Sequence, residues 1–550
     1  MIARRMAFAA LAGAVCVTLP HSIRAQQQLP SLTGSTYEPG VDVLDYDVRL
    51  ELPDTGAFLR GDVTVTARRV PSLATLRLDL VHSLRVRAVE VNGRAVQATH
   101  EADRLAIPLV SAAGDTVRVR VVYDGVVRDG LVVRKDSLGR WTWFGDNWPD
   151  RARQWLPTVD HPSDKATVSW TVRAPAGRTV VANGLSLGTR PLSGRDAGRA
   201  ETRWRETHPI APYLMVIAAG PLAKYDLTPR CTGAEAGRCV PQAVYVLPEN
   251  RSWLPGPFSS APSILEYFEL LIAPFPYEKL AHFQSSTRFG GMENATVIFY
   301  QGKLFPEHAV TERTIAHETA HQWFGDAVTE REWAHLWLSE GFADYFEALW
   351  TRHAHGDDAF TASMREIRAT ILEDSVVAVR PVIDTAQTNY LALLNANSYQ
   401  KGSYVFYLLH RELGDSAFFR GARSYYLTHR DGTALTDDLR RALERSSGRS
   451  LATFFDQWLR RPGVAEPSIG WAYDASTGSV SVFVLQDSAR TYTFPLTVAI
   501  TDAAGVSHRA ELVVPAESRA AIALPGRFAG KPRAIGFDPD SVLLGRITPL

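Results

Sequence analysis

The 550-residue sequence predicts a multidomain α+β protein, because three successive parts of it follow different hydrophobic patterns. Apolar and polar residues alternate from about residue 38 to 250, the period becomes helical from about 260, and alternation returns after 463. With 45% hydrophobic and 21% charged residues, the composition is that of globular domains and excludes a disordered or collagen-like chain. Lys+Arg and Asp+Glu both number 59, so we expect no nucleic-acid partner.

The first residues predict a targeting segment. Arginines precede an apolar run over 6–19, and a short polar stretch ends at Ala25, which is the order of a cleaved signal peptide. The run, about 14 residues long, is short for a membrane span. We therefore expect an exported protein, periplasmic or secreted, without a transmembrane anchor; an uncleaved anchor is the alternative. Export favours a disulfide between Cys231 and Cys239, with free thiols as the alternative.

The N-terminal part reads as strands. Residues 46–52, 62–67 and 117–123 alternate apolar and polar side chains and are rich in β-branched residues. Asn-Gly pairs at 92–93 and 183–184 predict two-residue hairpin turns.

The middle part predicts helices and the last part predicts strands. A helix over 263–272 should stop before Pro274, and the last part contains alternating or apolar runs that predict a small β-sandwich. Further helices are expected over 311–324, 339–353, 398–413 and 450–460. The predicted divisions are a signal segment over 1–25, an N-terminal β-rich domain over 26–250, a catalytic domain over 251–463 and a β-sandwich over 464–550.

An HExxH motif lies within the helix expected over 311–324. His317 and His321 are four residues apart and share one helical face, so both imidazoles can reach one metal ion. Glu318 lies about 100° around the helix, beside such an ion but outside its ligand set. A catalytic zinc needs a third ligand and an open position, and Glu340 is the candidate. Asp344, one turn further, can accept a ring N–H from a histidine ligand; a solvated carboxylate is the alternative.

Several motifs carry a family resemblance. The run HETAHQWFGDAVTEREWAHLWLSEGFADYFE over 317–347 resembles the aminopeptidase N and leukotriene hydrolase family of gluzincin zinc metallopeptidases. GGMEN over 290–294, YQKG over 399–402 and a degenerate signature within 152–166 are similar to elements of the same family. The resemblance covers about 38–465. It implies an N-terminal β-saddle and a thermolysin-like catalytic domain ahead of the C-terminal β-sandwich.

The resemblance also implies a function, a zinc-dependent aminopeptidase that hydrolyses the N-terminal bond of peptides with a free N-terminus. One Zn2+ per chain is implied, although manganese or cobalt could bind the same groups. The implied roles are metal ligation by His317, His321 and Glu340, general base catalysis by Glu318, oxyanion stabilisation by Tyr399, amine binding by Glu293, and contact with the extended peptide by Gly290, Gly291 and Met292.

Two features depart from the family. Trp148 stands where many relatives carry a second amine-binding Gln or Glu, and Asp146 is a candidate replacement two residues earlier. The residues after 464 read as strands, so we expect no large helical C-terminal domain and a more open cleft. The rival functions are a non-peptidase zinc hydrolase such as an epoxide hydrolase, an endopeptidase, and a binding protein with an inactive site. The sequence leaves the oligomeric state and the preferred N-terminal residue open.

Overall fold

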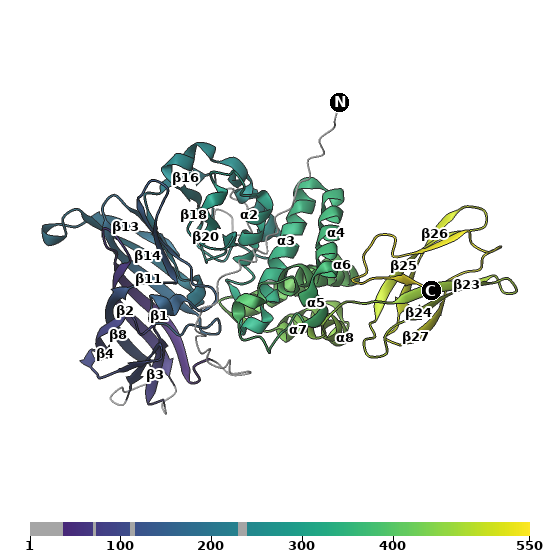
Figure 1. Cartoon of the computed structure of the whole chain (residues 1–550), viewed down its shortest axis with the longest axis horizontal. Coiled ribbons are helices and arrows are strands. Elements are labelled where there is room, and N and C mark those ends of the chain that lie inside the picture. Colours follow the sequence, from purple (N-terminus) through teal and green to yellow (C-terminus); the bar gives the residue numbers. More distant parts are fainter. Residues whose placement is uncertain (1–36, 70–72, 110–115, 229–238) are drawn as a thin grey trace.

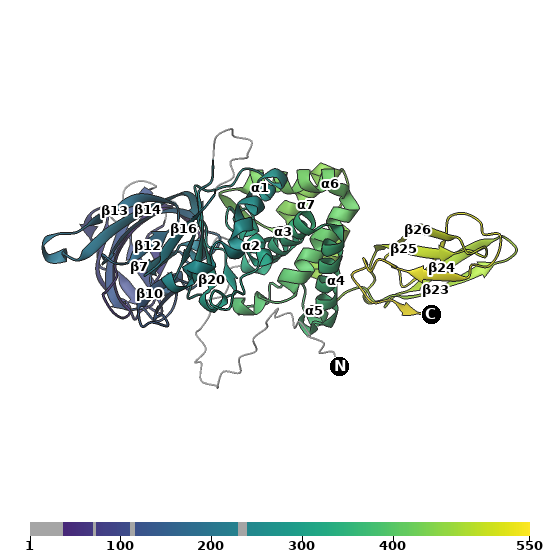
Figure 2. The same ribbon diagram turned by 90° about the horizontal axis from the view of Figure 1, so that it is seen from above.

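The computed structural model describes residues 37–69, 73–109, 116–228 and 239–550. Figures 1 and 2 show an elongated molecule, with the N-terminal strands at one end, the helices in the middle and the C-terminal strands at the other end. The expected signal segment and Cys231 lie outside the described residues, whereas Cys239 is disulfide-bonded. No helix among the described residues has the length and hydropathy of a membrane span.

The described part of the N-terminal domain contains three sheets, as its alternating pattern predicts. Its largest sheet has eight strands in the order β13-β14-β11-β1-β2-β8-β4-β5, and a four-stranded sheet has the order β12-β15-β10-β9. Strand β1 (Val41–Glu51) shows why: its alternate side chains are buried in the core while those between them face outward. The other strands of the large sheet are β2 (Phe58–Arg69), β4 (Arg85–Val91), β5 (Arg94–Ala95), β8 (Thr116–Val126), β11 (Ala166–Pro175), β13 (Leu185–Pro191) and β14 (Arg199–Ile210). The smaller sheets contain β9 (Leu131–Lys135), β10 (Trp141–Gly145), β12 (Thr179–Ala182) and β15 (Ile217–Gly220), and β3 (Thr75–Asp79), β6 (Thr99–Glu101) and β7 (Arg104–Pro108).

The two Asn-Gly turns have different outcomes. The turn at 92–93 is a two-residue hairpin, confirmed by the pairing of Val91 with Arg94. The hairpin predicted at 183–184 is wrong, because β12 and β13 on either side of it belong to different sheets. The Asn183 amide is buried and donates to the carbonyls of Leu214 and Ala295. This turn therefore connects the N-terminal domain to the catalytic domain instead of joining two paired strands.

The catalytic domain combines one sheet with a group of helices. Its five strands follow the order β16-β17-β18-β20-β19, so the sheet draws strands from both sides of residue 250. The strands are β16 (Ala223–Leu227), β17 (Gln242–Val246), β18 (Leu280–Ser285), β19 (Gly291–Met292) and β20 (Val297–Gln301).

The five expected helices are present, with shifted ends. The helix expected over 263–272 is α1 (Ala261–Leu271), and that over 311–324 is α2 (Glu312–His321). The segment expected to end at 413 continues through a kink at Gly414, whose φ is 75°, to His429. The remaining helices are α3 (Trp337–His355), α4 (Asp357–Glu373), α5 (Ser375–Val379), α6 (Gly402–His429), α7 (Thr436–Ser447) and α8 (Ala452–Phe455), of which α4, α5 and α7 were not predicted.

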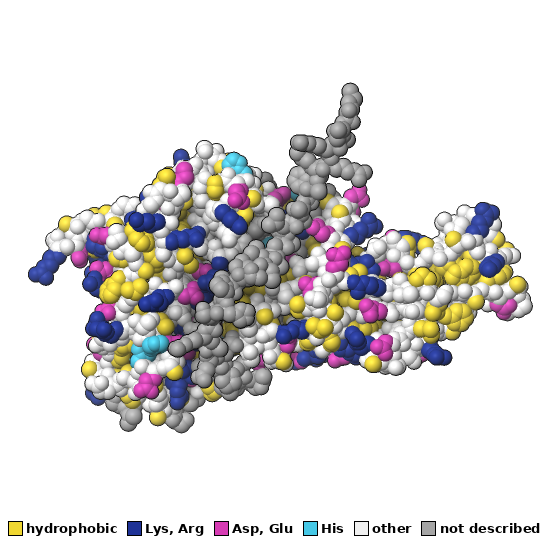
Figure 3. Space-filling model, viewed as in Figure 1, with side chains coloured by type: hydrophobic (Ala, Val, Ile, Leu, Met, Phe, Trp, Pro, Cys, Tyr) yellow, Lys and Arg dark blue, Asp and Glu magenta, His cyan; other side chains and the backbone are white. Residues whose placement is uncertain are grey.

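Residues 464–550, all of which the structure describes, form two small sheets and no large helical domain. The sheets follow the orders β27-β24-β23-β29 and β26-β25-β28, and β24 turns Val480, Val482 and Val484 inward. Figure 3 shows hydrophobic side chains gathered over this end of the molecule. The strands are β23 (Ser468–Asp474), β24 (Ser479–Leu485), β25 (Phe494–Thr501), β26 (Ser507–Val514), β27 (Arg519–Ala523), β28 (Ala534–Phe537) and β29 (Thr548–Pro549).

Candidate active site

Helix α2 presents the two histidines of the HExxH motif. The helix begins after Thr311, whose hydroxyl accepts a hydrogen bond from the backbone N–H of Thr314 and caps the first turn. His317 and His321 share one face, and their Nε2 atoms lie 3.0 Å apart. Two ring nitrogens at this distance point toward a common position.

Glu340 on α3 completes a three-ligand site. Its Oε2 lies 3.4 Å from His317 Nε2 and 3.3 Å from His321 Nε2, and this buried oxygen has no hydrogen-bond partner. Ligand atoms placed about 2.0–2.1 Å from a tetrahedral zinc ion are about 3.3 Å from one another. The three donor atoms therefore fit a zinc ion, as predicted, and leave the fourth tetrahedral position open.

Each imidazole is oriented through its other ring nitrogen. His317 Nδ1 lies 2.9 Å from Asp344 Oδ1, one turn along α3 from Glu340. His321 Nδ1 lies 3.2 Å from the carbonyl of Phe324 and 3.0 Å from the hydroxyl of Ser339. A partner on Nδ1 leaves Nε2 free to bind a metal. The two partners of His321 could not be predicted from the sequence, because a backbone carbonyl and a single serine form no recognisable motif.

The charges of the three ligand side chains affect one another's pKa values. Burial disfavours the ionised form of Glu340, but the adjacent imidazoles outweigh it and lower the pKa of this carboxyl to about 2. Burial likewise opposes the charged form of His317, while Asp344 and Glu340 raise its pKa well above the usual value. The site therefore concentrates negative charge around the position that a cation would occupy.

Glu318 is the buried carboxylate beside this position. Burial raises the pKa of Glu318 to about 8, although both imidazoles oppose the shift. Gly291 in β19 lies directly against it, and a Cβ atom at Gly291 would come within 1.8 Å of Glu318 Oε1. A Cβ at Gly290 would meet nothing within 4 Å. Of the two glycines, only Gly291 is required for the position of Glu318.

Glu293 lines the same pocket as Glu340. It is buried, one of its carboxylate oxygens lies within 4.8 Å of atoms of Glu318 and His321, and burial raises its pKa. Gln322 fixes this segment, because its amide donates to the carbonyl of Glu293 at 2.7 Å and accepts from the N–H of Thr296 at 2.9 Å. The residue after the HExxH motif thus ties α2 to the GGMEN segment.

Tyr399 reaches the same pocket from a π-helical turn, Asn397–Lys401, that directly precedes α6. Its hydroxyl donates to Glu340 Oε1 at 2.9 Å, and burial raises the pKa of the phenol so that it stays protonated. Helices α3 and α6 approach closely at two glycines, since a Cβ at Gly341 would lie 2.9 Å from the backbone of Gly402. The glycine after Glu340 and the glycine of the YQKG motif therefore allow the contact between Tyr399 and Glu340.

These side chains line one cavity of about 240 Å3. The structure brings all the predicted metal-ligating, catalytic and substrate-binding residues to it, with Asp344 behind His317. Three further lining residues, Trp148, Phe289 and Leu394, were not predicted as pocket walls. Trp148 and Leu394 come from segments distant from the motifs, whereas Phe289 directly precedes Gly290. No local pattern distinguishes these three from core residues.

Asp146 does not take the place of the missing amine-binding acid. Its side chain is fully buried outside the pocket lining and interacts with Arg151 and Arg288. Trp148 does line the pocket, packed edge-on against Phe289 and Trp333. Among the described lining residues, Glu293 is thus the one carboxylate available for an amine apart from Glu318 and the metal ligand Glu340.

Comparison with known proteins agrees with this geometry. Residues 44–214 match the model of the peptidase M1 N-terminal domain, and residues 258–458 match that of the peptidase family M1 domain. The chain belongs to peptidase family M1. The family resemblance inferred from the motifs is thereby confirmed.

The curated relatives include longer M1 enzymes. The chain is 27% identical to an aminopeptidase N of Streptomyces lividans over 476 residues, which are 82% of this chain and 53% of that protein. It is 28% identical to human glutamyl aminopeptidase over 335 residues, 58% of this chain and 34% of that protein. The chain thus spans about half the length of the former and a third of the latter.

Solved structures share the architecture. An M1 zinc metallopeptidase of Deinococcus radiodurans, as a mutant bound to a Tyr-Ser-Ala substrate, has a TM-score of 0.68 and 26% identity; the match covers 79% of this chain and 97% of that one. Aminopeptidase A of Legionella pneumophila has a TM-score of 0.79 at 17% identity, with 92% of this chain and 60% of that chain covered, and shows a common fold. The multidomain α+β fold predicted from the sequence is confirmed.

Proposed function

We propose that this M1 protein is a zinc-dependent aminopeptidase that releases the first residue of peptides with a free N-terminus. The observation that carries the proposal is the position of Glu293, whose carboxylate lies in the same cavity as the three-ligand site and within 4.8 Å of atoms of Glu318 and His321. A carboxylate there can hold an α-ammonium by a charge-assisted hydrogen bond. It would place the first peptide bond, rather than an internal one, at the metal.

The chain's own side chains supply the remaining chemistry. A zinc ion held by His317, His321 and Glu340 would polarise the scissile carbonyl and lower the pKa of a water molecule toward about 7. Glu318 takes the proton of the attacking water and delivers it to the leaving amine. Tyr399 donates a hydrogen bond to the carbonyl oxygen as it becomes negative, a contact typically worth about 2.7–4 kcal/mol.

The names of the relatives support this proposal. The Streptomyces lividans relative is an aminopeptidase N, and the Deinococcus radiodurans enzyme was solved with a tripeptide. The intact set of ligands, base and tyrosine argues against an inactive binding protein. We also propose export of the protein, supported by the disulfide bond of Cys239 and by the N-terminal sequence.

The test compares aminoacyl arylamides with the same compounds after N-acetylation, using zinc-loaded protein. The free-amine compounds should be cleaved and the acetylated ones should not. Glu293→Gln should lower kcat/KM by about 10²-fold or more for free-amine compounds, since it removes a charge-assisted contact. Glu307→Gln, at an exposed position, is the matched control. Equal cleavage of both sets of compounds would instead identify an endopeptidase or broad amidase.

A further inference from the structure

A network of four charged side chains joins the N-terminal and catalytic domains beside the pocket. Asp146 Oδ2 accepts hydrogen bonds from Arg151 at 3.3 Å and from Arg288 at 3.2 Å. Asp129 Oδ1 accepts from the same two arginines at 2.8 and 2.9 Å. Asp146 also accepts from the Thr287 hydroxyl at 3.2 Å. Each aspartate thus contacts an arginine of its own domain and Arg288 of the other domain.

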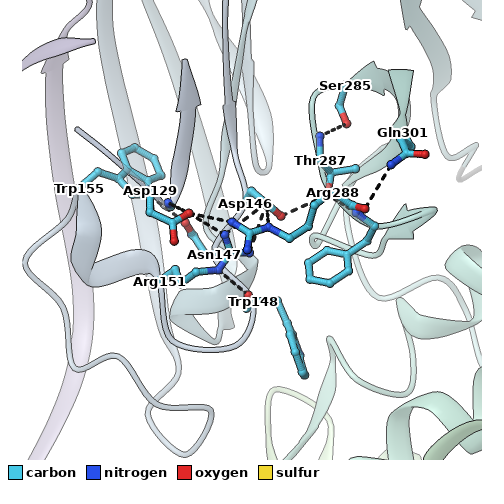
Figure 4. A network of polar contacts seen from close by, with 12 residues as sticks. Asp129, Asp146, Asn147, Trp148, Arg151, Trp155, Ser285, Thr287, Arg288 and Gln301 are labelled. Carbon is cyan, nitrogen blue, oxygen red and sulfur yellow. Dashed lines mark hydrogen bonds and ion pairs between the residues drawn. The ribbon is translucent and has the colours of Figure 1, made fainter. Parts of the chain in front are cut away.

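This network holds the two segments that carry the aromatic side chains of the pocket. Arg151 donates through Nε to the carbonyl of Trp148 at 2.8 Å, and Arg288 precedes Phe289 in the chain. Figure 4 shows Asp146 between Arg151 and Arg288, with the Trp148 ring extending away from the network. The rings of Trp148 and Phe289 meet edge to face, with centroids 6.0 Å apart. One wall of the pocket is therefore made across the domain junction.

The pocket is lined by carboxylates and by apolar side chains. Its carboxylates are Glu293, Glu318 and Glu340, and no Lys or Arg is among the described residues that line it. An acidic side chain entering this pocket would add a buried negative charge beside three carboxylates, with no Lys or Arg among the described lining residues to pair with it, which is unfavourable. An apolar side chain would instead remove aromatic surface from water.

We propose that Trp148 and Phe289 form the contact surface for the first side chain of the substrate, which makes the enzyme favour peptides that begin with a large apolar residue over those that begin with an acidic one. Arg288 and Asp146 are positioning residues that hold this surface across the domain junction. The proposal rests on the proposed aminopeptidase function, because Glu293 must hold the amine for the first side chain to reach this wall.

The test measures kcat and KM for the Phe, Leu, Ala and Glu arylamides. The wild-type kcat/KM for Phe and Leu should exceed that for Glu by at least about 10²-fold, given the cost of an unpaired buried charge. Trp148→Ala should lower kcat/KM for Phe and Leu by about 10–100-fold, mainly through KM, and that for Ala by less than about 3-fold. Trp148→Phe should restore most of the lost preference if the wall needs an aromatic ring.

Arg288→Gln tests the positioning role in the same assay. It should reduce the Phe-over-Ala ratio by about 5-fold or more, since a misplaced wall loses contact with large side chains first. Arg190→Gln is the matched control, because Arg190 pairs with Glu201 on the N-terminal sheet. It should leave the ratio unchanged. Thermal unfolding of each variant establishes that the fold is kept.

The possible results separate this inference from the proposed function. Preference for Glu over Leu, or equal losses for Ala and Phe in Trp148→Ala, would overturn the inference while aminopeptidase activity stands. A loss of kcat/KM in Trp148→Ala that is confined to the large substrates would support the aromatic wall. If acetylated compounds were cleaved as well, the exopeptidase assignment would be overturned. Absence of cleavage of every arylamide would overturn both.

Discussion

The outer face of the N-terminal eight-stranded sheet and the active-site pocket both gather ionisable side chains, but their charges are compensated differently. On the sheet, Glu201 lies 2.8–3.1 Å from the guanidinium groups of Arg173, Arg190 and Arg203. Burial opposes ionisation of Glu201, yet these partners lower its pKa to about 2. Figure 3 shows positive and negative side chains interspersed over this end of the molecule.

In the pocket, like charges are buried together. Burial raises the pKa of Glu318 to about 8 and also raises that of Glu293, while only Glu340, beside the two imidazoles, has a lowered pKa. Carboxylates held against their preferred ionisation state occur where a site is arranged for catalysis or binding. The comparison teaches that the pKa shift of a buried carboxylate depends on its partners: three arginines lower the pKa of Glu201, whereas burial raises those of Glu318 and Glu293.

The largest expected effect is on kcat, and it is tested by the same substitution, Glu to Gln, made in each of the two regions. Glu318→Gln should lower kcat by about 10²–10⁴-fold, because it removes the general base. Its zinc content, measured by elemental analysis, should be unchanged, since Glu318 is not a ligand. The matched substitution Glu201→Gln should keep kcat within about 2-fold of wild type, because Glu201 is not among the residues that line the pocket. Comparable losses of kcat in both variants would contradict this difference between the two regions.

Removal of the phenol hydroxyl should have the next largest effect. Tyr399→Phe should lower kcat by about 10²–10³-fold with little change in KM, because the hydrogen bond is stronger in the transition state than in the bound substrate. Steady-state kinetics on one arylamide is sufficient. A change confined to KM would show that Tyr399 binds substrate rather than stabilising the oxyanion.

Two neighbouring glycines sharpen the description of the pocket. Gly291→Ala should lower kcat by about 10–100-fold, because the new methyl group would displace Glu318 from its position. Gly290→Ala is the control, since its methyl group would meet no protein atom within 4 Å. Similar rates for the two variants would show that Gly291 does not control the position of Glu318.

The smallest effect concerns the stability of the charged sheet face. Glu201→Gln should lower the free energy of unfolding near neutral pH by about 1–2 kcal/mol, a discounted value because the three arginines are half-exposed. The folded-state pKa of Glu201 is lowered, so its contribution is complete above the unfolded pKa of about 4.5 and is lost as the pH falls toward about 2. Denaturant unfolding at pH 7 and pH 3 measures this; a difference between wild type and variant that grows on acidification would contradict it.

The sequence by itself determined the elements whose causes are local. The spacing of His317 and His321 places both rings on one helix face, and alternation within each strand predicts its buried side. The turn at 92–93 was predictable for the same reason, because a two-residue hairpin depends on its own φ values. The turn at 183–184 was not, since Asn183 finds its partners Leu214 and Ala295 only in the folded chain.

Only the tertiary structure decided which distant segments meet at the site. It assigned Asp146 to an ion-pair network, brought Trp148 from the N-terminal domain against Phe289, and placed Gly291 directly against Glu318. These contacts depend on the packing of two domains, and a residue's identity does not state which neighbours packing will bring to it. The spacing of residues along the sequence determines the set of metal ligands, whereas the packing of the two domains determines the wall of the pocket.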